Sequence, residues 1–383
     1  MRRARPSCRL FTGVVCPQAV GPVSIEALRH SHPDIFVLDP AEPSTVEEAM
    51  RQAMLLVDGE RVIHCSRAGE GNMNCTVRVR TSRRSVILKQ SRPWVEKYPS
   101  LAAPWDRVCR EWEFYQAARG VAGVADRMPL VLHLDPVARW MAIEDLGNTG
   151  DYTGIYRGEV LLVEDLQALA DFLGRLHRVP REPGQPALWN RDMRALNHAH
   201  VFQIPFQASN GLDLEAISPG LSAAGARVQG DAGLVRLAFE LGRDAYLTDG
   251  ATLIHGDFFP GSLVRTPRGP RVIDPEFGFH GRSEYDVGVW LGHLVLAGQP
   301  EVLLDAWRES YRAPAGYDES LAIQLAGVEV IRRLIGYAQL PIQCTAKGRI
   351  RRLNLGVALM RSPTVETLRE GLVEVRSTEG NAC

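Results

Sequence analysis

Two short stretches near residue 260 hold the residue types that phosphoryl transfer requires. In the first, a His-Gly pair precedes Asp257, and the hydroxyl of Ser262 follows five positions later. In the second, Asp274 and Glu276 follow an apolar run that is typical of a buried strand. In phosphoryl transfer the protein mainly positions groups and offsets charge: one carboxylate orients the acceptor hydroxyl, and others hold magnesium against the phosphates. We therefore expect a phosphotransfer site on these two loops.

Asp257 is the candidate catalytic residue of this site. An aspartate in a tight turn is by itself more often a turn or cap residue. The second acidic segment, seventeen residues further on, favours the functional interpretation. Asp274 and Glu276 are separated by one proline, so both carboxylates could face the same Mg²⁺ ion, which takes oxygen ligands. Ser262 fits as a further oxygen ligand or as a group behind the ligands.

A glycine-containing turn and a lysine strand earlier in the chain are candidates for nucleotide binding. Backbone amides in such a turn can hold phosphate oxygens, although two glycines between strands often form only a hairpin. The candidate residues of the turn are Gly69, Gly71, Asn72 and Asn74. Lys89 ends the next apolar strand and could contact the α- and β-phosphates. We expect its acidic partner to be Glu111, with Glu113 as the competitor on the same predicted helix.

Two adjacent arginines, Arg332 and Arg333, lie within an otherwise apolar segment. Guanidinium groups are costly to bury unless they line a binding site or pair with acids. The residues alone leave two interpretations open. Either both arginines bind oxygens of an acceptor, or one is exposed and the other forms a salt bridge.

Composition limits the classes of protein that the chain can belong to. With 383 residues it is long enough for two lobes with separate cores. The net charge of −1 favours neither nucleic acid nor an anionic membrane surface as a partner. No run reaches the length of a membrane-spanning helix. The seven cysteines are scattered and lack metal-ligand spacing, so we expect reduced thiols in a cytoplasmic protein.

The first part of the chain is predicted to be rich in strands. Residues 1–22 have the composition of a loose tail, and Ser44 resembles the start of a capping box that opens a helix through Leu56. A second helix is predicted over 106–119. Alternating or continuous apolar residues predict strands at 61–65, 75–80, 85–89, 130–133 and 140–143.

After Asp145 the pattern is mainly helical. Apolar residues at three- and four-residue spacing predict a helix over 159–176, and further helices are predicted over 235–247 and 320–339. Short strands at 253–254 and 271–273 would carry the two chemical loops. We therefore expect an α+β, bilobal, protein-kinase-like fold, with a small β-rich N-lobe and a larger, mainly helical C-lobe. The N-lobe, 23–145, would bind nucleotide, and the C-lobe, 146–383, would hold the catalytic and acceptor-binding groups.

Together these motifs resemble those of the 5-methylthioribose kinases, within the aminoglycoside phosphotransferase and choline kinase family. The resemblance rests on the loops around Asp257 and Asp274, the glycine turn, the strand of Lys89 and the arginine pair, and it spans roughly residues 55 to 360. An Asp-x-Glu motif and a serine at position 262 are marks of that subgroup. Two segments, 99–107 and 189–205, depart from its pattern, and both concern the acceptor pocket more than the nucleotide pocket.

The resemblance implies a protein-kinase-like fold that uses ATP and Mg²⁺. It also implies that backbone groups at a hinge, around Glu144 and Leu146, hold the adenine. Arg332 and Arg333 would contact a sugar, and the protein would form a homodimer.

Three functions follow from the sequence. The first is an ATP-dependent kinase acting on a hydroxyl of a small polar metabolite, above all a sugar such as 5-methylthioribose. The second is an aminoglycoside or amino-alcohol phosphotransferase, but cationic acceptors suit an acidic pocket better than an arginine pair. The third is a catalytically inactive nucleotide-binding module. The complete set of Lys89, Asp257 and Asp274 argues against the third function.

Overall fold

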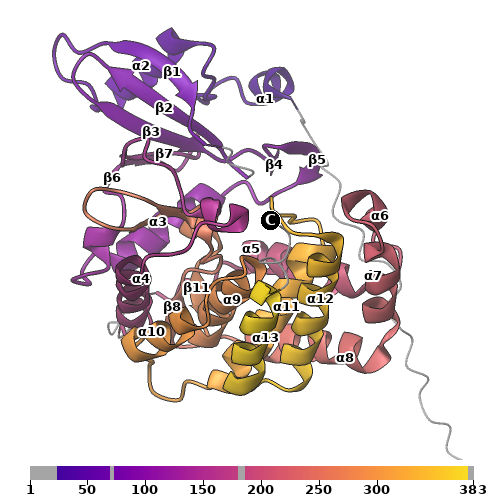
Figure 1. Ribbon diagram of the computed structural model, residues 1–383. Coiled ribbons are helices and arrows are strands. Elements are labelled where there is room, and N and C mark those ends of the chain that lie inside the picture. Colours follow the sequence, from indigo (N-terminus) through magenta and orange to yellow (C-terminus); the bar gives the residue numbers. More distant parts are fainter. Residues whose placement is uncertain (1–23, 70–72, 180–185, 378–383) are drawn as a thin grey trace, which may run out of the picture.

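The computed structural model describes residues 24–69, 73–179 and 186–377, which form a small β-rich lobe and a larger helical lobe (Figure 1). The predicted bilobal α+β arrangement, with a small β-rich lobe and a larger, mainly helical lobe, is confirmed. The expected loose tail, 1–22, lies outside the described residues, and the domain boundaries stay predictions. None of the described helices is both long and apolar enough to cross a membrane.

A five-stranded antiparallel sheet forms the centre of the small lobe, with its strands in the order β1-β2-β3-β7-β6. The strands are β1 (Val62–Arg67), β2 (Cys75–Thr81), β3 (Ser85–Gln90), β6 (Val131–Asp135) and β7 (Trp140–Glu144). All of them were predicted to within two residues at each end. Cys75, Val77 and Val79 are buried, as the alternation in β2 predicts.

Short helices and a hairpin accompany this sheet. They are α1 (Ile25–Ser31), α2 (Pro43–Gln52), α3 (Arg107–Ala118), β4 (Trp94–Val95) and β5 (Tyr98–Ala102). The predicted capping box at Ser44 is wrong, because Pro43 occupies the first turn and places Ser44 inside the helix. The same helix ends before Leu56 because the chain adopts a left-handed conformation at Met54 (φ 56°).

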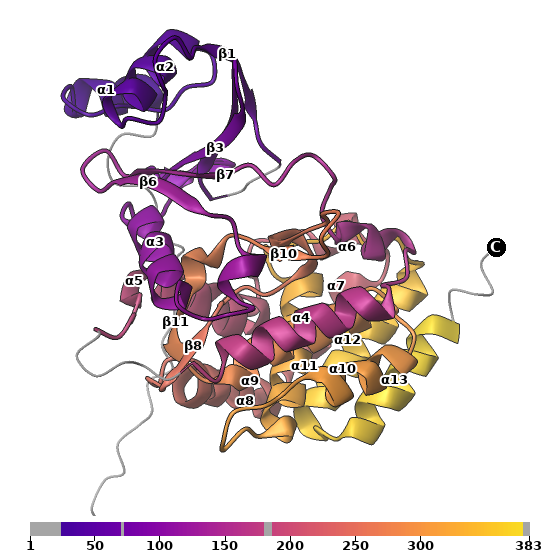
Figure 2. The same ribbon diagram turned by 90° about the vertical axis from the view of Figure 1, so that its left-hand side faces the viewer.

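Strand β3 sends its side chains alternately to two cores. Val86 and Leu88 pack in the core that contains residues of α2. Ile87 belongs to the larger core, which also contains residues of α3. Because side chains of a strand alternate, Lys89 is on the same face as Ile87. The strand period therefore directs Lys89 toward α3, which lies between the sheet and the helical lobe (Figure 2).

The larger lobe is mainly helical. Its helices are α4 (Val163–Leu176), α5 (Arg191–His198), α6 (Leu214–Ile217), α7 (Leu221–Gly230), α8 (Ala232–Leu241), α9 (Ser283–Leu296), α10 (Val302–Ser310), α11 (Glu319–Ile335), α12 (Ala346–Arg361) and α13 (Val365–Ser377). Two small antiparallel pairs carry the chemical loops: β8 (Thr252–Ile254) with β11 (Phe279–Gly281), and β9 (Leu263–Val264) with β10 (Arg271–Val272). The predicted helix over 159–176 starts four residues later, at Val163. The helix predicted over 235–247 starts three residues earlier, at Ala232, and continues after Leu241 as a π-helix, Gly242–Tyr246.

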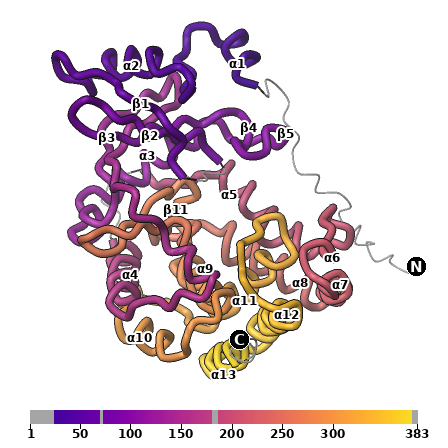
Figure 3. The backbone as a smooth tube through the Cα atoms, turned by 45° about the horizontal axis from the view of Figure 1, so that its top comes forward, coloured from indigo at the N-terminus to yellow at the C-terminus, as the bar shows by residue number. Residues whose placement is uncertain are grey.

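Helix α9 is the centre of this lobe, since every one of its residues is buried. Helix α11 packs closely against it, with α12 alongside (Figure 3). Gly288 and Gly292 permit the close approach: a Cβ atom on Gly288 would lie 2.7 Å from Cβ of Leu325, and one on Gly292 would lie 3.0 Å from the carbonyl oxygen of Ala326. This contact brings the C-terminal half of α11 against the polar side chains of α9.

Candidate active site

Lys89 lies at the centre of a buried ion cluster. Its Nζ atom is 2.7 Å from both carboxylate oxygens of Glu111 and 2.6 Å from Oδ1 of Asp274. The lysine is 3% exposed and Glu111 is fully buried, whereas Asp274 is 42% exposed. Burial lowers the pKa of Lys89, but Asp274 and Glu111 outweigh it and raise that pKa. Glu113, the alternative partner, instead pairs with Arg110 at 2.6 Å.

The chain turns sharply at Asp274, directly after β10. Its φ of 61° is left-handed, a conformation that aspartate and asparagine adopt more readily than most residues. A short 3₁₀ turn, Pro275–Phe277, follows. The amide of Ile273 donates a hydrogen bond of 2.9 Å to the carbonyl oxygen of Ser262, which joins the two predicted chemical loops. Ser262 itself is buried at this junction.

Glu276 is hydrogen-bonded to Asn74, at the C-terminal end of the glycine turn. Its Oε2 atom accepts a 2.7 Å hydrogen bond from Nδ2 of Asn74 and lies 3.9 Å from Nε of Arg107. Burial raises the pKa of Glu276 to about 7, a rise that Lys89 and Arg107 oppose. Asp274 and Glu276, expected to face one ion together, therefore have different partners in this structure, Lys89 for the first and Asn74 for the second.

The oxygen groups of the site supply some of the ligands that a magnesium ion needs. Proteins commonly bind Mg²⁺ through one or two carboxylates, with phosphate oxygens and water completing the octahedron. The half-exposed carboxylate of Asp274 has this character. Within the described ranges, no three His, Cys, Asp or Glu side chains are grouped as a metal site.

The glycine turn is described only in part, because Gly71 and Asn72 lie outside the described residues. Gly69 has a φ of +68°, which glycine adopts without strain. The guanidinium of Arg107 donates hydrogen bonds to the carbonyl oxygens of Met73 and Trp94. This fully buried arginine, which was not predicted, ties the end of the turn to α3.

The predicted hinge follows the end of β7. Oε2 of Glu144 accepts a 3.2 Å hydrogen bond from the amide of Leu130, and Leu146 is half-buried. Between them, both carboxylate oxygens of Asp145 bind the guanidinium of Arg78 in β2, at 2.8 and 3.0 Å. The ion pair fixes the hinge to the sheet, and adenine binding by Glu144 and Leu146 stays a prediction.

The loop that carries Asp257 is held by buried hydrogen bonds. The amides of His255 and Gly256 donate to the carboxylate of Asp286 in α9, at 2.6 and 2.9 Å. Gly256 has a φ of +82°, and a Cβ atom there would lie 2.1 Å from the carbonyl oxygen of Phe277. Only glycine fits this position, as the turn interpretation requires. Nε2 of His255 also contacts the carbonyl oxygen of Ile273 at 2.9 Å, so the two loops lie together.

Asp257 faces the arginine pair. Its Oδ1 atom lies 3.3 Å from Nη2 of Arg333 and 3.9 Å from Nη1 of Arg332. Burial raises the pKa of Asp257, and the two guanidiniums oppose that rise. Both arginines are almost fully buried, so the interpretation with one exposed arginine is wrong.

Glu329 is the member of this cluster that was not predicted. Its carboxylate binds both arginines, at 2.9 Å from Nη1 of Arg332 and 2.6 Å from Nε of Arg333. The signal was present in the sequence, because residues three and four positions apart on a helix are neighbours. A glutamate one turn before two arginines could thus have been chosen as their common partner.

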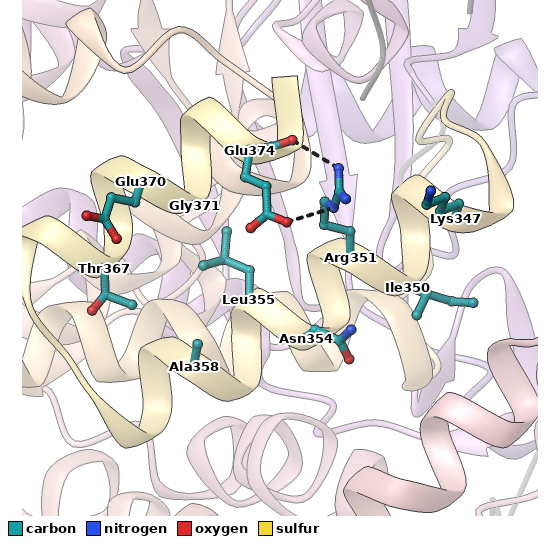
Figure 4. Close-up of a pocket in the computed structure, with 10 residues that line it drawn as sticks. All are labelled: Lys347, Ile350, Arg351, Asn354, Leu355, Ala358, Thr367, Glu370, Gly371 and Glu374. Atoms are coloured by element: carbon teal, nitrogen blue, oxygen red, sulfur yellow. Dashed lines mark hydrogen bonds and ion pairs between the residues drawn. The ribbon is translucent and has the colours of Figure 1, made fainter. Parts of the chain in front are cut away.

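A groove of about 570 Å³ lies between α12 and α13, and none of the predicted site residues lines it (Figure 4). Leu355 and Gly371 line it, as do Arg351 and Glu374, which form an ion pair of 3.0 Å. The chemical groups therefore gather elsewhere, where the small lobe meets the helical lobe.

Comparisons with known proteins find phosphotransferases among the proteins similar to this chain. A model of a phosphotransferase enzyme family matches residues 64–320. A methylthioribose kinase of Exiguobacterium sibiricum is 28% identical over 276 residues, which is 67% of each chain. One of Escherichia coli is 28% identical over 284 residues, covering 68% of this chain and 63% of its own length. Methylthioribose kinase 1 of Oryza sativa is 27% identical over 60% of this chain and 55% of its own. The chain thus spans about two thirds or less of these relatives.

The solved structures that are similar to this chain include two phosphotransferases. One is a spectinomycin phosphotransferase in complex with ADP and spectinomycin, with a TM-score of 0.48 and 13% identity over 88% of this chain and 100% of that one. The other is a choline kinase from Streptococcus pneumoniae, with a TM-score of 0.47 and 14% identity over 86% of this chain and 98% of that one.

Proposed function

Since the chain belongs to this phosphotransferase enzyme family, we propose that it is an ATP-dependent kinase for a hydroxyl group of a small polar metabolite. One observation carries the proposal. Lys89 binds Glu111 and Asp274, and the Asp274 segment is joined through Ile273 to the loop that holds Asp257. The candidate phosphate-binding cation, the candidate metal ligand and the candidate base therefore come from distant parts of the chain to neighbouring loops, which supports the proposal.

Each group near the nucleotide has a distinct role in this proposal. Lys89, oriented by Glu111, contacts the α- and β-phosphates, and the amides around Gly69 and Asn74 hold the terminal phosphates. Asp274 would hold Mg²⁺, and Glu276 and Ser262 would support it. When bound, this ion neutralises charge on the phosphates. The protein's contribution is to place the triphosphate in line with the acceptor.

Asp257 orients the acceptor hydroxyl and accepts its proton. A carboxylate whose pKa is raised by burial is a better proton acceptor than an exposed one. Arg332 and Arg333 flank Asp257 and would donate hydrogen bonds to acceptor oxygens.

The proposed acceptor is a sugar such as 5-methylthioribose. Two features support it: the relatives are named methylthioribose kinases, and the arginine pair favours neutral or anionic acceptors over cationic ones. An aminoglycoside or an amino alcohol would bring positive charge against two guanidiniums.

The test is an ADP-release assay with 5-methylthioribose, ribose, an aminoglycoside and choline, on the wild type and Asp257→Ala. We expect turnover with the thiosugar and a loss of about 100- to 10,000-fold in kcat in the variant, the usual range for removing a general base. Asp244→Ala removes an exposed aspartate that pairs with its exposed neighbour Arg243, and serves as the matched control. Full turnover by Asp257→Ala would remove the mechanism, and ATP binding without transfer to any acceptor would favour an inactive module.

A cytoplasmic location and a homodimer stay predictions. Light scattering coupled to size-exclusion chromatography measures the oligomeric state directly, and fractionation of the source cells measures the location.

A further inference from the structure

One carboxylate on α11 holds both arginines of the acceptor side. Glu329 stands one helical turn before Arg332 and Arg333, on the face that they share. It is 2.9 Å from Nη1 of Arg332 and 2.6 Å from Nε of Arg333. The three side chains are buried, with only 1%, 6% and 5% of their surfaces exposed. Two guanidiniums can be buried here only because a carboxylate compensates their charge.

The same arginines also reach the candidate base. Arg333 binds Glu329 through Nε and approaches Oδ1 of Asp257 to 3.3 Å through Nη2, so it bridges the two carboxylates. Its guanidinium lies 4.8 Å from the ring centre of Phe259, two residues after Asp257. Arg332 lies 3.9 Å from the same oxygen of Asp257. Both guanidiniums thus have their directions fixed from the α11 side.

Helix α9 fixes Glu329 in turn. Nε2 of His293 is 3.1 Å from Oε1 of Glu329, and Nδ1 of His293 is 2.6 Å from the hydroxyl of Tyr156. Burial raises the pKa of Glu329, but Arg332 and Arg333 outweigh it and lower that pKa well below its ordinary range. An ionised carboxylate only accepts hydrogen bonds, so Nε2 of His293 carries the hydrogen and Tyr156 donates to Nδ1. Every group in the chain of contacts has one defined role.

The charges of the cluster balance only when Glu329 is counted. Arg332 and Arg333 carry two positive charges, and Glu329 and Asp257 can carry two negative ones. The other titratable groups that interact with Asp257 include His255 in its own loop and the buried phenols of Tyr156, Tyr246 and Tyr285. Without Glu329, Asp257 would be the one carboxylate within 4 Å of the two guanidiniums among the described residues.

We propose that Glu329 is a positioning residue for the acceptor. It shares the two guanidiniums with Asp257, so that Asp257 is not their sole counterion. The remaining donors of Arg332 and Arg333 can then face acceptor oxygens, and Asp257 stays available to the reacting hydroxyl. The inference rests on the proposed kinase function. It assigns part of the enzyme's affinity for the acceptor to Glu329, which would act through the two arginines and not by contact with nucleotide or acceptor.

Glu329→Gln tests the inference, because it keeps the shape and removes the charge. We expect KM for the acceptor to rise by about 10- to 100-fold, as for a lost hydrogen bond to a charged group. KM for ATP should stay within about twofold of the wild-type value, the usual range for a distant substitution. Glu319→Gln makes the same chemical change at the start of the same helix, in a half-exposed pair with Arg308, and should alter neither constant. Unchanged acceptor KM in Glu329→Gln, or an equal rise in both constants, would overturn the inference.

Two further measurements test the inference if Glu329→Gln does not fold or if the wild type shows no turnover. Glu329→Asp keeps the buried charge, so its acceptor KM should lie between those of the wild type and Glu329→Gln. If Glu329→Gln does not fold, Glu329→Asp alone decides, and an acceptor KM equal to that of the wild type is the contrary result. If the wild type phosphorylates no acceptor, the proposed function fails separately. Crystal structures of the wild type and Glu329→Gln then decide. We expect Arg333 to lie closer to Asp257 in Glu329→Gln than the 3.3 Å of the wild type. Unchanged arginine positions would refute the role of Glu329.

Discussion

The two ion clusters of the site differ in their balance of charge. Around Lys89, one ammonium faces the carboxylates of Glu111 and Asp274, so negative charge is in excess. On the acceptor side, the arginine pair faces Glu329 and Asp257, and the charges are equal in number. A cluster with excess carboxylate is suited to receive a metal cation, whereas a balanced one is suited to a polar acceptor. This difference supports the proposal that nucleotide and metal bind at the Lys89 cluster and that the acceptor binds at the arginine pair.

The clusters also differ in how they are assembled. Lys89 and Asp274 are 185 residues apart, and their contact depends on the position of the small lobe relative to the helical lobe. Glu329, Arg332 and Arg333 come from a single turn of α11, so their relative positions are fixed by the helix. We expect substitutions in the first cluster to alter metal and nucleotide binding, and those in the second to alter acceptor affinity.

The largest effect is expected from Asp274→Asn, which breaks the charge contrast. Asparagine tolerates the left-handed backbone at this position, so the fold should persist. Loss of the exposed carboxylate should lower kcat by on the order of 1,000-fold, as for removal of a preorganised charge, and weaken the dependence on Mg²⁺. The measurement is ADP release during a magnesium titration, with circular dichroism as the check on folding. A loss below about tenfold would exclude Asp274 as the principal metal ligand.

A second, smaller effect concerns the stability of the Lys89 cluster. Lys89→Met leaves Glu111 buried without its cation, and we expect the free energy of unfolding to fall by about 3–5 kcal/mol. Adding Glu111→Met removes the unpaired charge and should restore most of that stability, although not activity. Urea denaturation of the two variants and the wild type measures this coupling. Additive losses would mean that the pair makes no buried interaction of this kind.

The smallest effect, counted per unit of pH, is a pH dependence of stability at His293, next to the arginine pair. Burial lowers the pKa of His293 to about 4, below the value of about 6.5 expected in the unfolded chain. Between these values the unfolded state binds more protons, so stability contributed by His293 is lost as the pH falls from about 6.5 to 4, by about 1.4 kcal/mol per pH unit.

His293→Gln checks this dependence. The amide can still donate to Glu329 and accept from Tyr156, but it does not titrate. The variant should lose stability less steeply than the wild type over the same range in thermal unfolding at a series of pH values. Parallel curves would show that His293 is not the group responsible.

Local patterns predicted the elements that carry Lys89 and Asp257. The sequence order of lysine strand and acidic helix favoured Glu111 as the partner of Lys89 and left Glu113 as the competitor, and the structure pairs Lys89 with Glu111. Gly256 likewise signals the turn before Asp257, since the neighbouring backbone leaves no room for a Cβ atom.

Contacts between distant segments could not be predicted in this way. Asn74 and Glu276 are 202 residues apart, and no local pattern indicates that the glycine turn would bind the second carboxylate. Local competition caused the error at Ser44, where Pro43 took the helix start that the capping pattern indicated. Glu329 belongs to a different class, because its helical spacing from the arginines was visible and only its burial was not.

The most direct measurement is a crystal structure of the protein with Mg²⁺, a non-hydrolysable ATP analogue and 5-methylthioribose. We predict that the phosphates lie between Lys89 and a magnesium ion on Asp274, with an acceptor hydroxyl within about 3 Å of Asp257. A nucleotide bound away from Lys89, or an acceptor bound out of reach of Asp257, would contradict the proposal that these residues surround one triphosphate.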